Sequence, residues 1–111
     1  MIIYNIFENL EFSKDREIED LIFENEKIRL VRTASLGQAT DYYDQEELEI
    51  VKIEEGSARL EIVKIEEGSA RLEIEGEIVD LKKGDILKIS PHQIHKVISQ
   101  EKTIWLCIFV K

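Results

Sequence analysis

Cysteine is almost absent from this 111-residue chain: Cys107 is the single one, so no internal disulfide can form. Its apolar surroundings, TIWLCIFV, predict a buried position. With one proline and five glycines, the composition does not fit a low-complexity or disordered chain. No apolar run approaches the roughly 20 residues of a membrane-spanning helix, and no basic region followed by an apolar run opens the chain. We therefore expect one ordered domain, residues 1–111, with a cytoplasmic location.

Basic residues are also in deficit, because 15 Lys and Arg stand against 24 Asp and Glu, for a formal net charge of −9. A surface of this sign repels nucleic-acid phosphates and anionic lipid headgroups. We therefore expect neither a nucleic acid nor a membrane as partner. The last segment, TIWLCIFV, is apolar on both faces of a strand, so one face should pack against the core and the other against a partner sheet or subunit. This pattern predicts a homodimer.

A tandem repeat interrupts the chain: VKIEEGSARLEI at residues 51–62 returns letter for letter at residues 63–74. A selected structural repeat keeps its core and turn positions while its surface drifts, so complete identity indicates a recent or deliberate duplication. We take residues 63–74 as the duplicated insert in a parent of 99 residues, twelve fewer than the 111 present. Because twelve is even, either copy can fill the parental strand with the same faces inward. We expect the other copy to form an excursion.

From Glu47 onward, short runs rich in Ile and Val alternate with turn residues, the pattern of an all-β domain. Ala70, Leu72 and Ile74 should share one face of a strand. The turns should fall at the four glycines of this region, Gly56, Gly68, Gly76 and Gly84.

The first third of the chain is less regular. Residues 27–34, KIRLVRTA, alternate like a strand. Ile18, Leu21 and Ile22 instead have the i, i+3, i+4 spacing of a short helix, and Ser13 is a plausible cap before it. We therefore predict a helical turn followed by a strand.

Two motifs between residues 31 and 110 resemble those of the cupin family. The first motif matches in its spacing at Gly37, Tyr43, Gln45, Glu49 and Gly56, although cupins usually carry histidine at the second and third of these positions. The second motif matches at Gly84, Pro91, His95 and Ser99, with its histidine at His95. YYDQ at residues 42–45 and the pair His92 and His95 are similar to a group of small bacterial cupins. The resemblance implies a double-stranded β-helix, the jelly-roll barrel.

The resemblance also implies a site inside the barrel, where cupins usually hold a metal through three histidines and a glutamate. This sequence keeps Glu49 and His95 at those positions and has Tyr43 and Gln45 at the other two. His92 offers a further nitrogen, although residues three apart in an extended strand face opposite sides. The implied pocket is therefore Tyr43, Gln45, Glu49, His92 and His95. Glu49, His92 and His95 are its candidate ligands for Fe, Mn, Ni or Zn.

A metal-free polar pocket, with His95 as a hydrogen-bonded core histidine, is the alternative. Three functions therefore stay open. The first is a small cupin that binds a small molecule, a divalent metal or both in its interior. The second is a metal-dependent oxygenase or isomerase, which needs at least three inward ligands. The third is a metal-free barrel with a structural or oligomerisation role.

Overall fold

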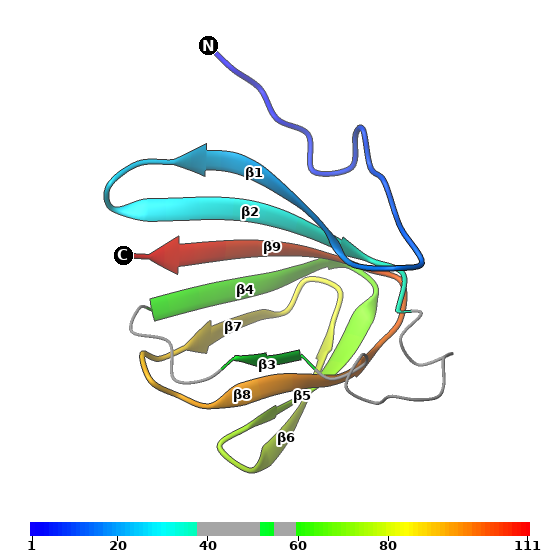
Figure 1. Ribbon diagram of the computed structural model, residues 1–111, viewed down its shortest axis with the longest axis vertical. Coiled ribbons are helices and arrows are strands. Elements are labelled where there is room, and N and C mark those ends of the chain that lie inside the picture. The colour runs from blue at the N-terminus through cyan, green and yellow to red at the C-terminus, as the bar shows by residue number, and fades with distance from the viewer. Residues whose placement is uncertain (38–51, 55–59) are drawn as a thin grey trace.

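The structure is a computed structural model that describes residues 1–37, 52–54 and 60–111. Two antiparallel sheets account for all regular structure in these ranges (Figure 1). The larger sheet has the strand order β1 (Ile18–Glu24), β2 (Ile28–Ser35), β9 (Thr103–Val110), β4 (Leu60–Glu67) and β7 (Ile86–Ile89). The smaller has the order β3 (Lys52–Glu54), β8 (His95–Gln100), β5 (Ser69–Ile74) and β6 (Glu77–Lys82). This architecture confirms the predicted all-β jelly-roll class. The described ranges contain no helix suited to crossing a membrane.

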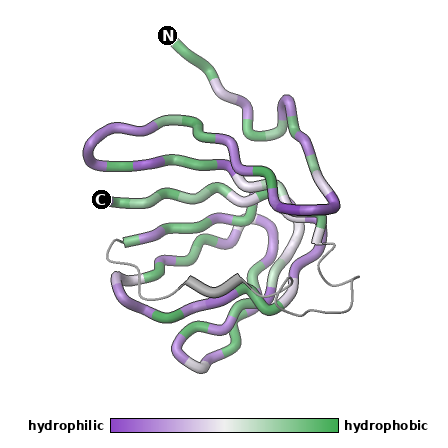
Figure 2. Tube along the Cα trace, in the orientation of Figure 1, coloured by the Kyte–Doolittle hydropathy of each residue, from purple (hydrophilic) through white to green (hydrophobic). Residues whose placement is uncertain are grey.

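The core lies between the two sheets and follows the two-residue period of the strands. Ala70, Leu72 and Ile74 are all buried, as their alternation predicted. The same apolar cluster includes Ile65, which has no exposed surface, and Cys107, whose predicted burial is confirmed. Figure 2 shows hydrophobic and hydrophilic residues alternating along the strands. One face of each sheet therefore supplies the apolar interior.

The helical turn predicted around Ile18, Leu21 and Ile22 is wrong, because these residues lie in β1, paired antiparallel with β2. The pairing register shifts between Leu21 and Phe23, so β1 carries a bulge. One extra residue in a strand changes which side chains share a face, and it can imitate helical spacing over a short stretch. The strand predicted at residues 27–34 is confirmed by β2.

The second copy of the repeat is part of the barrel wall. Residues 63–74 supply most of β4 and all of β5, and Gly68 joins the two strands with a φ of 95°. A Cβ at Gly68 would collide with the Lys102 carbonyl oxygen and with Thr103, so this turn requires glycine. Within the first copy, Lys52–Glu54 forms the edge strand β3. Val51 and residues 55–59 lie outside the described residues, and with them much of the predicted excursion.

Removing either copy of the repeat, 51–62 or 63–74, gives the same 99-residue chain, which we expect to fold with a melting temperature (Tm) equal to or above that of the full chain. The residues that form β4 and β5 survive in one copy, while the connections shorten, and long loops are entropically costlier to close. Thermal unfolding followed by circular dichroism measures the effect. Deletion of residues 75–86, equal in length but without a copy, should abolish the cooperative transition. A 99-residue chain without such a transition would show that both copies are structural.

An arginine fastens the N-terminal segment to the outside of the larger sheet. The Arg32 side chain is 2% exposed and forms an ion pair with Asp20 at 2.7 Å. Its guanidinium also donates hydrogen bonds to three backbone carbonyls of the segment before β1, those of Ile6, Glu8 and Asn9. The Tyr4 ring lies 5.3 Å from the guanidinium carbon. Residues 4–9 are therefore held as a strap across β1 and β2.

Candidate binding site between the two sheets

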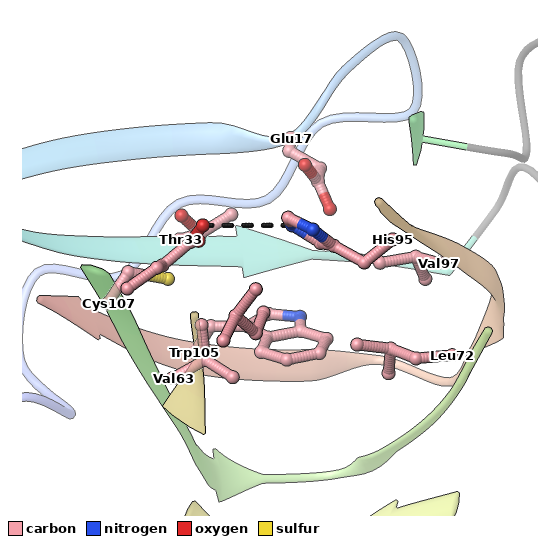
Figure 3. Close-up of a pocket in the computed structure, with 10 residues that line it drawn as sticks. Glu17, Thr33, Val63, Leu72, His95, Val97, Trp105 and Cys107 are labelled. Carbon is pink, nitrogen blue, oxygen red and sulfur yellow. Dashed lines mark ion pairs between the residues drawn. The ribbon is translucent and has the colours of Figure 1, made fainter. Parts of the chain in front are cut away.

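A cavity of about 50 Å³ lies between the sheets. Both sheets contribute to its wall, so the cavity is an interior feature of the barrel (Figure 3). Its lining residues are Glu17, Thr33, Glu61, Val63, Leu72, Ile89, His95, Val97, Trp105 and Cys107. Most of these side chains are apolar, so the few polar groups act in an environment of low dielectric constant.

His95 and Glu61 form the polar centre of the cavity. Their side chains are 4% and 9% exposed, and His95 Nε2 lies 3.7 Å from Glu61 Oε1, the contact dashed in Figure 3. The other ring nitrogen, Nδ1, lies 2.9 Å from the Gln93 carbonyl oxygen. Because a carbonyl oxygen only accepts, Nδ1 carries the proton of this hydrogen bond. In the neutral ring, Nε2 then presents a lone pair toward Glu61.

This arrangement suits a cation. A neutral imidazole nitrogen and a carboxylate oxygen are both acceptors, and their 3.7 Å separation is longer than an ordinary hydrogen bond. Metal bonds to nitrogen and carboxylate oxygen are about 2.0–2.2 Å long, so one ion can contact both atoms across this distance. Histidines that bind metals commonly donate their second N–H to a backbone carbonyl, as Nδ1 does here. A proton on Nε2 would instead make the contact an ion pair.

A hydrogen-bonded chain places a second carboxylate at the cavity. Trp105 Nε1 donates to Gln100 Oε1 at 2.9 Å, and Gln100 Nε2 donates to Glu17 Oε2 at 3.0 Å. Figure 3 shows the Glu17 carboxylate pointing toward the His95 ring, with the Trp105 ring on the opposite side. The amide of Gln100 therefore orients both an aromatic wall and an acidic group of the cavity.

The two histidines predicted for the site lie in different places. His95 lines the cavity, on the first residue of β8. His92 is exposed in the preceding turn, with a φ of 66°, and does not line the cavity, so the structure does not bring the two together. Tyr43, Gln45 and Glu49 lie outside the described residues. Among the residues that are described, no three His, Cys, Asp or Glu side chains gather closely enough to hold a metal ion.

Glu61 is the candidate site residue that the sequence analysis did not identify. It follows Glu49 by twelve residues, and six residues separate it from Gly68, as six separate Glu49 from Gly56. The interval between the glutamate and the last glycine of the first motif therefore fits Glu61 and Gly68 as well as Glu49 and Gly56. The structure places the carboxylate of Glu61, near the end of the first copy, beside His95.

Comparison with known proteins supports the fold. Residues 53–106 match the family described as the AraC-like ligand binding domain. A structure from Ralstonia eutropha JMP134, provisionally designated a mannose-6-phosphate isomerase, superposes with a TM-score of 0.81 at 22% identity, covering 100% of this chain and 99% of that one. An RmlC-like cupin from Desulfovibrio desulfuricans gives 0.76 at 17% identity, covering 99% and 96%.

A cupin superfamily protein from Desulfitobacterium hafniense DCB-2 gives a TM-score of 0.67 at 16% identity, covering 91% of this chain and 83% of that one. A search of curated proteins finds no match to the sequence. The match to a ligand-binding domain, the two-sheet barrel and these structural neighbours agree with the motif spacing, and the chain is a cupin by its fold.

Proposed function

We propose that this cupin binds a divalent cation, with a small ligand beside it, through His95 and Glu61. The supporting observation is the locked imidazole: Nδ1 bonds the Gln93 carbonyl, which leaves Nε2 facing the Glu61 carboxylate at 3.7 Å. An imidazole and a carboxylate suit Fe, Mn, Ni or Zn. Such an ion, when bound, would polarise an oxygen atom of the small ligand. As far as the described residues go, coordination positions not filled by His95 and Glu61 would take water or that ligand.

The size of the cavity supports a ligand of few atoms. Sites for drug-sized molecules measure about 300–1,000 Å³, whereas a water molecule occupies about 30 Å³ of liquid. Bounded by the described residues, the cavity of about 50 Å³ suits an ion with a water or a similarly small group.

Binding is better supported than catalysis. The described residues supply two ligands at the cavity, fewer than the three protein ligands typical of a catalytic metal site. The match to the AraC-like ligand binding domain points to the same role. We therefore place metal-dependent oxygenase or isomerase activity second.

Replacing His95 by alanine should weaken Ni²⁺ or Zn²⁺ binding by at least about 10–100-fold, the loss that even a residue supporting a ligand causes. Isothermal titration calorimetry on protein without a histidine tag measures the affinity. His92→Ala is the matched control, since His92 is the other histidine of the chain and is exposed outside the cavity. An unmodified protein that binds none of Fe, Mn, Ni and Zn, or an equal loss in both variants, would contradict the proposal.

A further inference from the structure

We infer that this barrel forms in two registers, because the residues that build β4 and β5 are present twice. The fifteen-residue sequence LEIVKIEEGSARLEI occupies residues 60–74 and also residues 48–62, with LEI shared between the two windows. In the described register, residues 60–74 form β4, the Gly68 turn and β5. In the second register, residues 48–62 take all three roles, twelve positions earlier. This inference does not depend on the proposed function.

Every packing contact of β4 and β5 is available to the second register. Val63 and Ile65 are 4% and 0% exposed in β4, and their counterparts twelve residues earlier are Val51 and Ile53. The turn that requires glycine at Gly68 finds it at Gly56. Because the side chains are identical, the pairing with β6, β7, β8 and β9 is preserved. The core alone therefore does not discriminate between the registers.

In the second register, residues 63–74 would become part of the connection between β5 and β6. In the described register this connection is a two-residue hairpin loop, Glu75 and Gly76, both with positive φ values. The shift would lengthen it by twelve residues. A Cβ on Gly76 meets no atom within 4 Å, so the tip of this hairpin faces open space. In exchange, the connection between β2 and β3 would shorten from residues 36–51 to residues 36–39. Loop-closure entropy changes slowly with length, so the two registers should be close in free energy.

The register decides which residues stand beside His95. In the described register, Glu54 of β3 is the backbone partner of His95, and Glu61 approaches its Nε2. Twelve residues earlier, these positions are Tyr42 and Glu49. The second register would therefore place Glu49 beside His95, as the cupin motif spacing predicted. One chain would offer two pocket walls, and the specificity for a ligand would differ between them.

An aspartate in one copy tests the exchange. Ile65→Asp puts a charge at a fully buried position, which a chain limited to the described register cannot tolerate. With exchange available, Ile53 replaces Ile65, so we expect cooperative unfolding with a Tm within about 5 °C of the unmodified protein. Ile53→Asp should behave likewise. The double variant should not fold, and neither should Ile89→Asp, a control that is 1% exposed and lies outside the repeat.

Limited trypsin digestion of the folded single variants reports the register directly. Arg71 lies in β5 between β6 and β8 in the described register, whereas the second register moves it into the enlarged β5–β6 connection. Ile65→Asp should therefore be cut after Arg71 at least tenfold faster than Ile53→Asp. An Ile65→Asp chain as unfolded as Ile89→Asp, equal cleavage in the two single variants, or a folded double variant would each overturn the inference.

Discussion

Replacing Arg32 by alanine should lower the free energy of unfolding by about 3 kcal/mol, since removing one partner of a buried ion pair typically costs 3–5 kcal/mol. We expect the lower end of that range because the Asp20 side chain is 40% exposed and can regain water. The substitution also leaves the carbonyls of Ile6, Glu8 and Asn9 without their guanidinium donor. Urea unfolding measures the loss, and faster proteolysis of residues 1–12 would show that the strap has detached.

Arg71→Ala is the matched control for Arg32→Ala. Arg71 also pairs with an aspartate on the neighbouring strand, at 2.7 Å from Asp80, but its side chain is 54% exposed. Hydrogen bonding from Arg71 lowers the pKa of the Asp80 carboxyl, so the contact exists, yet water screens it. The Tm of Arg71→Ala should therefore stay close to that of the unmodified protein. Similar losses in the two variants would show that burial does not set the strength of the Arg32 contacts.

The burial of Arg32 and its contacts with the N-terminal segment could not be predicted from the sequence. The alternation of residues 27–34 predicts a strand, and a charged residue on such a strand is expected to face water. Arg32 is buried because residues far away along the chain, Ile6 to Asn9, fold over it and accept its hydrogen bonds. Local patterns carry no information on such contacts.

The strands with a clean two-residue period were predictable, and the bulged one was not. Ala70, Leu72 and Ile74 alternate in β5 and are buried as expected. In β1, the bulge between Leu21 and Phe23 breaks the alternation, and Leu21 is 54% exposed despite its apolar side chain. Pairing with β2 decides the conformation there, because intrinsic strand preferences depend strongly on context.

The candidate site was predictable only in part. The spacing of the second motif led to His95, which lines the cavity, because the turn and strand preceding it have the lengths that the fold requires. The choice between Glu49 and Glu61 could not be made, because both lie in identical sequence and have identical local preferences. Only the pairing of β4 with β9 and β7 places Glu61 at the cavity. Tertiary register is the missing information, and the repeat makes it ambiguous.

Replacing Gly37 by alanine should be as damaging as the loss of Arg32, lowering the free energy of unfolding by about 3 kcal/mol, from left-handed strain of 1–2 kcal/mol together with overpacking of 1–3 kcal/mol. Gly37 has a φ of 72° and follows β2 at the start of the first cupin motif. A Cβ there would lie 2.8 Å from the Glu101 carbonyl carbon, 2.9 Å from its oxygen, and closer still to the Gln100 oxygen. These are backbone atoms where β8 turns into β9, so they cannot relieve the overlap by a rotamer change, as a side chain could.

Gly76→Ala separates the two causes of this loss. Gly76 also has positive φ, 85°, but a Cβ on it meets nothing within 4 Å. It should therefore cost only the left-handed strain, about 1 kcal/mol, and its urea midpoint should fall by roughly a third as much as that of Gly37→Ala. Equal shifts would mean that backbone conformation alone explains the requirement for glycine at Gly37. A larger shift for Gly37→Ala would assign the difference to the close approach of the β8–β9 turn, which fixes the end of β2 against the strand that begins at His95.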